Sequence, residues 1–391
     1  MQLHRYYINN KGEKMKKVLN WCKSNVIFMV VCVIAIISCF IIPIDKGYLG
    51  YFKGSGETLT CIFGILIIVA GLENIDFFHK VARLIIKKFK SVRSIIITLL
   101  FITYVSALIN ANDMALLTFL PLSYLVLKCI NKTEYLAFTF IMQNIASNLG
   151  GMISPIGNPQ NIYLFSYYNI GLLEFFKIMA IPTLCAAILI VVCCLFIKNE
   201  PVEYSDDYNH SLNVPKLIVY AVLFVLTFLV VSGVIPFYIV LPIIIVTMIV
   251  CDYKTFAKVD YTIPLTFVAF FIFSGNMARI PSIAELMIKF ADKQTFLCAY
   301  LSCQLISNVP TSILLSKFTN NYPALLVSVN VASLGIIFSS LSGVIAMKCF
   351  VKYKPEDSKH GAWYYIGLDL LMNIVLLLVL YPVSYFSLML W

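Results

Sequence analysis

Long uncharged apolar runs are the feature that most restricts what this 391-residue chain can fold into. Residues 26–44 form one such run of 19 residues, long enough for a helix to cross the hydrocarbon layer of a bilayer. Charged residues make up only 12% of the chain, whereas a soluble domain has about a quarter. This composition excludes a soluble enzyme and a nucleic-acid-binding module. It predicts an all-α polytopic protein of the lipid bilayer.

The basic residues predict the orientation. Six Lys or Arg precede the first apolar run and no small-residue cleavage site follows it, which indicates a retained first span with the N-terminus inside. Counting spans from there gives about nine, with the C-terminus outside. The lysines of loops 251–259 and 348–360 fit this orientation. We therefore expect an integral membrane protein with its N-terminus inside and its C-terminus outside.

The order of apolar and polar segments predicts two related halves joined by a linker. The expected parts are the N-terminus and first span (1–57), a first repeat (58–197), a polar linker (198–216), two connecting spans (217–259), a second repeat (260–350) and a loop with the last span (351–391). The first repeat contains a basic interfacial helix (74–93), a hairpin (94–128) and a broken helix (133–168); the second contains a hairpin (294–318) and a broken helix (322–347).

Three matches in the same order support the internal repeat. Residues 61–89 resemble 265–290, ANDMALL (111–117) resembles SNVPTSI (307–313), and QNIASNLG (143–150) resembles VNVASLG (329–335). The span count gives the two repeats opposite topologies. Inverted repeats are typical of secondary transporters, which bind substrate near the middle of the membrane between the repeats.

Each repeat contains a polar break flanked by two apolar arms. Asn110 to Asp113 form the first tip and Ser307 to Val309 the second. Polar backbone at membrane depth is tolerated where it is buried in protein or lines a cavity, which favours a re-entrant hairpin in each repeat. Two adjacent full spans would fit the lengths nearly as well.

A second break in each repeat interrupts a helix. Gly150, Gly151, Pro155, Gly157 and Pro159 lie within fifteen residues, 147–161, and cannot all sit in an unbroken helix without strain. Asn158 and Pro159 suit the start of the half-helix that follows. The second repeat has a milder break at Ser333 and Gly335.

These breaks predict the chemistry of the site. The N-terminus of a half-helix attracts an anion, and carbonyl, amide and carboxylate oxygens bind a hard cation such as sodium. Asn112, Asp113, Ser147 and Asn308 are the candidate sodium ligands, and no other cofactor or metal is expected. The candidate substrate- and ion-binding residues are Asn110, Asn112, Asp113, Ser147, Asn148, Gly150, Gly157, Asn158, Asn161, Ser307, Asn308, Thr311, Asn330, Ser333 and Gly335.

The chain resembles the ion transporter superfamily over about residues 58 to 350. The resemblance is carried by NANDMALLTFLP (110–121), NLGGMISPIGNPQN (148–161) and SNVPTSILL (307–315). It implies paired re-entrant hairpins, a scaffold and a transport domain, elevator-like alternating access and a homodimer. The wording as a whole, especially GNPQN (157–161), resembles short prokaryotic anion permeases, which implies the cytoplasmic membrane of a prokaryote. In the dicarboxylate branch each tip carries Ser-Asn-Thr; here the tips read Ala111-Asn112-Asp113 and Ser307-Asn308-Val309, which look more like the arsenite and sodium/proton branches.

The sequence therefore predicts a secondary active transporter of a small carboxylate or inorganic oxyanion, coupled to sodium or protons. Three alternatives stay open. The first is a sodium/proton antiporter or arsenite-efflux permease with Asp113 as the titrating group, and the second is a passive channel. The third, a membrane-embedded enzyme, is disfavoured because no histidine, metal cluster or nucleophile pair is positioned at membrane depth.

Overall fold

The computed structural model describes residues 26–42, 55–109, 112–202, 212–231, 234–277, 279–282, 285, 289, 294–316, 318–354 and 361–390. Asn110, residues 1–25 and residues 203–211 of the expected linker lie outside this set. The α-helices are α2 (Val26–Ile41), α4 (Ser55–Asn74), α5 (Phe77–Lys88), α6 (Val92–Ile109), α7 (Asn112–Cys129), α8 (Leu136–Gly151), α9 (Pro159–Tyr167), α10 (Leu172–Leu195), α11 (Val214–Val231), α12 (Phe237–Asp252), α13 (Thr262–Met277), α15 (Thr295–Ile306), α16 (Asn308–Leu315), α17 (Tyr322–Val331), α18 (Leu341–Tyr353) and α19 (Ala362–Ser387).

Short 3-10 helices complete the described elements. They are η1 (Thr133–Tyr135), η2 (Tyr253–Lys258) and η3 (Leu388–Leu390). The described residues form no strand, and the one β-type contact among them is an isolated antiparallel bridge between Ser91 and Pro201. The helical class expected from the composition is therefore confirmed.

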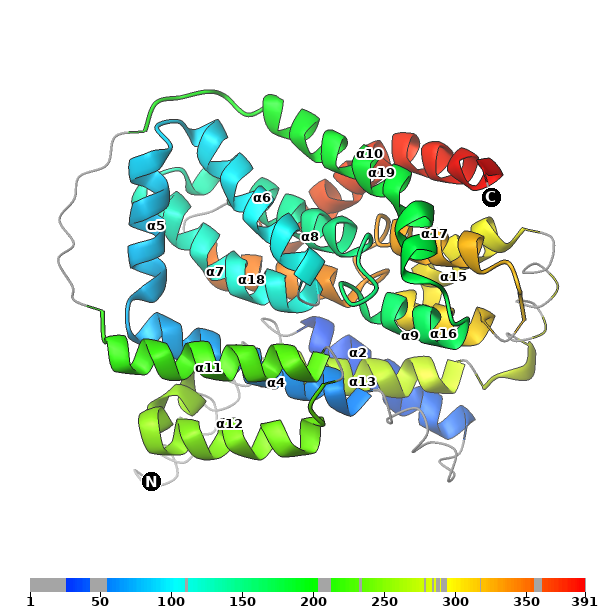
Figure 1. The fold of residues 1–391 in the computed structure, drawn as a ribbon, viewed down its shortest axis with the longest axis horizontal. Helices are drawn as coiled ribbons and strands as arrows, with labels where there is room; N and C mark the ends of the chain where they lie inside the picture. Colours follow the sequence, from blue (N-terminus) through cyan, green and yellow to red (C-terminus); the bar gives the residue numbers. More distant parts are fainter. Residues whose placement is uncertain are drawn as a thin grey trace, which may run out of the picture.

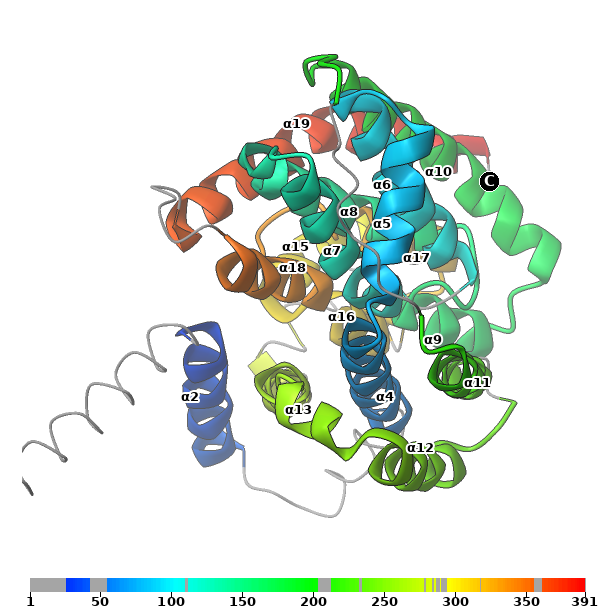
Figure 2. The same cartoon turned by 90° about the vertical axis from the view of Figure 1, so that its left-hand side faces the viewer.

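The helices form two layers, seen in Figure 1 and from the side in Figure 2. The lower layer holds α2, α4, α11, α12 and α13, which pack on one another. The upper layer holds α6 to α10 and α15 to α19. Helix α5 runs between the layers at one side and connects α4 to α6.

A sharp bend separates α4 from α5. The two helices meet at 73°, and Asp76 at the junction has a left-handed φ of 56°. Phe78, Ala82 and Ile86 are spaced four residues apart on one face of α5 and are buried, and α5 packs against α7. Within the fold, the apolar face of this basic helix is thus covered by protein.

Three helices in the described residues are long and apolar enough to cross a membrane: Leu172–Leu195, Phe237–Lys258 and Ala362–Leu390. The bent pair α4 and α5 would provide a fourth span if it crosses as one unit. Several shorter apolar helices accompany them, including Val92–Leu108, Thr295–Ile306 and Tyr322–Val331. Together with the composition, these helices indicate an integral membrane protein.

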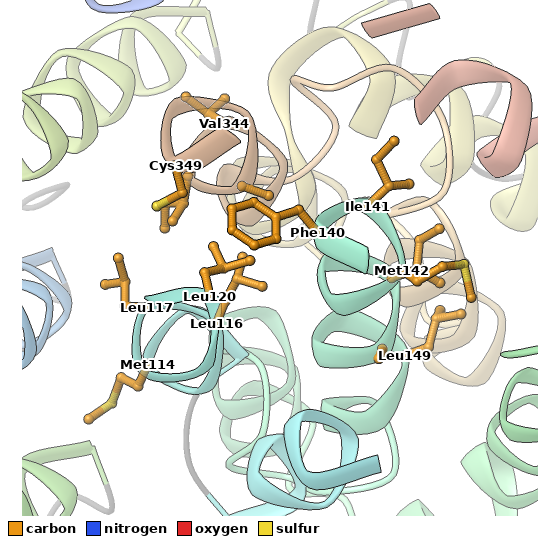
Figure 3. Packing of buried hydrophobic residues seen from close by; sticks show 14 of the residues in the cluster. Met114, Leu116, Leu117, Leu120, Phe140, Ile141, Met142, Leu149, Val344 and Cys349 are labelled. Carbon is orange, nitrogen blue, oxygen red and sulfur yellow. The ribbon is translucent and has the colours of Figure 1, made fainter. Parts of the chain in front are cut away.

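An apolar core holds the middle of the upper layer together (Figure 3). Leu116 and Leu120 of α7 are fully buried, and so is Phe140 of α8. Val344 of α18 is buried in the same cluster, and α7, α8 and α18 all pack on one another. This packing fixes the N-terminal end of α7 relative to α8 and α18.

A polar contact ties the end of α10 to the start of α6. The backbone N–H of Val92 donates to the carbonyl of Glu200 at 3.0 Å. Lys132 Nζ lies 2.5 Å from Glu200 Oε2, and this hydrogen bond lowers the pKa of the Glu200 carboxyl. Both side chains are partly exposed, so the ion pair stabilises the fold little. Its main effect is to orient the segment that follows α10.

Candidate functional site

The beginning of α7 is bonded to the first broken helix. The backbone N–H of Asn112 donates to the carbonyl of Gly157 at 2.9 Å. Its side-chain Nδ2 donates to Asn148 Oδ1, also at 2.9 Å. The first predicted tip therefore contacts both sides of the gap between α8 and α9.

Residues 152–158 form the gap between α8 and α9, which a side chain of α9 bridges. Helix α8 ends at Gly151 and α9 begins at Pro159. Asn161 Nδ2 donates to the carbonyls of Gly151 and Met152 at 3.3 Å and of Ser154 at 3.0 Å. Gly151 is the last residue of α8, whose carbonyl has no intrahelical partner, and Met152 and Ser154 lie in the gap. Asn161 thus bonds α9 to the end of α8 and to the gap between them.

The second half has a tip and a break of its own. Ser307, between α15 and α16, has a φ of 70°, a backbone conformation that non-glycine residues adopt at a cost of about 1–3 kcal/mol. Its Oγ donates to the carbonyl of Ser339 at 3.3 Å. Gln304 Nε2 donates to the carbonyl of Ala332, and Gln304 Oε1 accepts from the N–H of Ile336, both at 3.0 Å. The break between α17 and α18 is thereby bonded to α15.

Asn330 links the two breaks across the molecule. Its Oδ1 accepts from Asn158 Nδ2 at 2.8 Å and from Gln160 Nε2 at 3.2 Å. Its Nδ2 donates to Asn161 Oδ1 at 2.6 Å. A further bond, from Asn148 Nδ2 to Ser342 Oγ at 2.7 Å, joins α8 to α18. The two halves therefore share one buried network of amide hydrogen bonds.

Replacing Asn330 by alanine is expected to lower the free energy of unfolding by about 2–4 kcal/mol, because several buried partners lose their hydrogen bonds together. The melting temperature of the purified protein would measure this loss. Asn199→Ala is the matched control, since Asn199 is exposed and outside the helices. Equal melting temperatures for the two variants would show that the network does not hold the halves together.

Four buried acceptor oxygens of the two tips and the first break have no hydrogen-bond partner within the described residues. They are Oδ1 of Asn112, Asp113, Asn158 and Asn308. Each of these residues is at most 6% exposed. A buried acceptor without a donor costs free energy, so this arrangement suits a cation or a hydrogen-bond donor from a ligand.

The structure brings some of the predicted residues together and leaves others apart. Asn112, Asn148, Asn158, Asn161 and Asn330 share the network. Ser147 and Ser333 donate to the carbonyls of Asn144 and Asn330, residues three positions earlier in the chain.

The remaining candidates lie at close backbone contacts or apart from the network. A Cβ on Gly150 would meet the Tyr104 carbonyl at 2.6 Å, and one on Gly335 would overlap Gln304 Oε1. Within the described part of the chain, no hydrogen bond joins Asp113, Asn308 or Thr311 to the network.

Four contributors were absent from the predicted site: Asn144, Gln160, Gln304 and Ser342. Asn148 Nδ2 donates to the carbonyl and Oδ1 of Asn144 at 2.9 and 3.0 Å. Asn144 is the residue aligned with Asn330 in the repeat match, so the alignment contained a signal for it. Gln304 and Ser342 lie outside the aligned motifs, and only tertiary contacts identify them.

A small cleft of about 50 Å³ opens between the two layers, and none of the predicted residues lines it. Its lining includes Glu73, Asp260, Lys258 and Lys352. Lys348 of α18 reaches across it and donates to Thr262 Oγ1 at 3.0 Å and Thr266 Oγ1 at 2.9 Å of α13. This lysine is a direct polar contact between the upper and lower layers.

The apolar helices define the class of protein as a polytopic membrane protein whose helices are interrupted at buried polar segments. The chain belongs to the citrate transporter family, whose sequence model matches residues 17–347. This match confirms the resemblance to the ion transporter superfamily. Members of this family are transporters rather than enzymes.

Three relatives are similar to this chain; two are named as transporters and one as an inner membrane protein. An uncharacterized transporter of Methanocaldococcus jannaschii is 31% identical over 293 residues, which cover 75% of this chain and 80% of the relative. The inner membrane protein YbiR of Escherichia coli is 24% identical over 297 residues, 75% of this chain and 79% of its own. A Dictyostelium discoideum protein that carries the transporter name arsB is 21% identical over 155 residues, 39% of this chain and 27% of its own.

Proposed function

We propose that this protein is a secondary active transporter that moves a small carboxylate or inorganic oxyanion by alternating access, coupled to sodium or protons. The observation that carries the proposal is the pair of broken helices bonded through Asn330, with four unpartnered acceptor oxygens around them. Membership of the citrate transporter family supports an anionic substrate. The anion and the cation are expected to be bound by different groups of the protein.

The anion is expected at the starts of α9 and α16. Both helices begin at a break, at Pro159 and Asn308, and the N-terminal end of a helix carries a partial positive charge. The cation is expected at Asp113 with Asn112 and Asn308, whose Oδ1 atoms have no partner in the described residues. Oxygen atoms of this kind are the ligands that hard cations prefer.

The helix lengths support a re-entrant hairpin in the second repeat, whereas α6 and α7 of the first repeat have 18 residues each, about 27 Å, and come close to a full span. Helices α15 and α16 have 12 and 8 residues. At 1.5 Å per residue they extend about 18 and 12 Å, well short of the roughly 30 Å of a hydrocarbon core. The inverted relation of the repeats stays part of the proposal, supported by the equivalence of Asn144 and Asn330.

The assembly and the orientation are further parts of the proposal. A homodimer in the plasma membrane of a prokaryote, with the N-terminus inside and the C-terminus outside, is expected. Reporter fusions at the C-terminus test the orientation, and the mass of the detergent-solubilised particle tests the dimer.

Sodium/proton antiport or arsenite efflux is the second candidate function. It is favoured by the Asn112-Asp113 tip, which lacks the threonine of the dicarboxylate branch, and by the relative that carries the name arsB. A passive channel is the third candidate. Saturable uptake that accumulates substrate against its gradient would exclude the channel.

The thermal stability of the purified protein should rise when its substrate and coupling ion are both present, because both bind only the folded state. The screen covers dicarboxylates, tricarboxylates, sulfate, phosphate and arsenite, each in sodium and in potassium. A melting-temperature shift that needs an anion and sodium together supports symport. A shift with sodium alone, unaffected by every anion and lost in Asp113→Asn, would replace symport by the antiporter.

A further inference from the structure

Helix α19 presents one continuous buried face to the upper layer. Tyr365, Asp369, Asn373, Leu376, Leu380, Ser384 and Ser387 are buried and recur every three or four residues, the spacing of one helix face. Leu371 and Leu378 on the other side are exposed, as expected for contact with lipid. Helix α19 packs against α8, α10, α17 and α18 (Figure 2). Asp369 and Asn373 therefore lie on the inward face.

Three oxygen atoms in the first half of this face have no hydrogen-bond partner within the described residues. Asn373 Nδ2 donates to Asp369 Oδ2 at 3.0 Å, which leaves Asp369 Oδ1 and Asn373 Oδ1 without donors. The Tyr365 hydroxyl is also unpartnered. All three side chains are at most 2% exposed. The Tyr365 ring is held against Phe350 of α18, with ring centroids 4.9 Å apart.

An ionised carboxylate at this depth needs a compensating charge. Asp369 is the seventh residue after the start of α19, about 10 Å along the helix axis. No ion pair to Asp369 occurs within the described part of the chain. An ionised carboxylate without a counter-charge is unfavourable at membrane depth, and such groups mark ion sites by default.

The donor set defines the kind of ion. The carboxylate, amide and phenol groups offer only oxygen atoms, which suit a hard cation rather than a soft transition metal. One carboxylate balances one positive charge, which favours a monovalent over a divalent ion. We propose that Tyr365, Asp369 and Asn373 bind a small monovalent cation of the sodium class, at a site separate from the hairpin tips.

The test uses the full-length purified chain with Asp113→Asn, so that the site proposed at the hairpin tip is removed. Its melting temperature is measured at fixed pH in sodium chloride and in choline chloride of equal ionic strength. Sodium at about ten times its dissociation constant is expected to raise the melting temperature by about 2 °C. Adding Asp369→Asn should abolish the shift.

Two further variants make the result specific. Tyr365→Phe removes one ligand atom only, and should raise the sodium concentration for half of the shift by about tenfold. Ser384→Ala is the matched control, because Ser384 lies on the same buried face and its Oγ also has no partner in the described residues. The Ser384→Ala protein should keep the full shift.

Three results would overturn the site. The first is the absence of a sodium-dependent shift in the Asp113→Asn protein, and the second is a shift that survives Asp369→Asn. The third is stabilisation by lower pH alone, which would make Asp369 a protonated structural side chain. If Asp369→Asn does not fold, an unchanged sodium response in Tyr365→Phe overturns the proposal and a weakened one supports it.

Discussion

Replacing Asp113 by asparagine is expected to reduce cation-dependent uptake by roughly 100-fold while the protein still folds. Asp113 lies in the first turn of α7, is 6% exposed, and its Oδ1 has no partner in the described residues. Asparagine keeps the size of the side chain and removes only the charge that would hold a coupling cation. Uptake into proteoliposomes under an imposed sodium or proton gradient measures the effect.

The control for Asp113→Asn is a carboxylate far from the site. Glu134 has a side chain that is 59% exposed, so Glu134→Gln removes a negative charge without touching the buried network. This variant should transport normally. Wild-type cation-dependent uptake by Asp113→Asn would exclude Asp113 as the coupling residue and, with it, both the symport and the antiport roles proposed for the first tip.

Gly157→Ala is expected to destabilise the protein by about 3 kcal/mol or more and to abolish transport. A Cβ at this position would lie 2.7 Å from Gly151 Cα and 2.8 Å from the carbonyl oxygen of Ala107. Both contacts are with backbone atoms, which cannot rotate away as a side chain can. The gap between α8 and α9 would have to widen, and the Asn112–Gly157 hydrogen bond would be disturbed with it.

Gly367→Ala separates this effect from a general cost of changing glycine. No atom lies within 4 Å of a Cβ placed on Gly367, which is inside α19. In a helix interior alanine is about 1 kcal/mol more favourable than glycine, so this variant should melt at the same temperature or slightly higher. If Gly157→Ala matches Gly367→Ala in melting temperature and uptake, the close approach of Gly151 and Gly157 is not required.

The sequence alone identified the features that depend on local properties of the chain. Apolar run length and low charge predicted the helical membrane class, and the motifs around Asn112, Gly157 and Asn308 led to the transporter family that the comparison confirms. Glycine and proline between residues 150 and 159 predicted an interruption there, and α8 ends at Gly151 while α9 begins at Pro159. These features are local. The backbone geometry of glycine and proline determines where the helix breaks, and the free energy of transferring apolar residues from water to lipid determines the membrane class.

Only the tertiary structure decided which polar groups meet. Asn158 and Asn330 are 172 residues apart and Asn148 and Ser342 are 194 apart, and each pair forms a direct hydrogen bond. The sequence marked three of these four residues as candidates but could not pair them, because helix packing and not spacing sets such contacts. The sequence also could not show that Asp369 faces the protein interior. Which side of α19 is buried depends on its packing against α8, α10, α17 and α18. Local chemistry thus determined the kind of protein and where its helices break, and long-range packing determined which buried oxygens are left for a ligand.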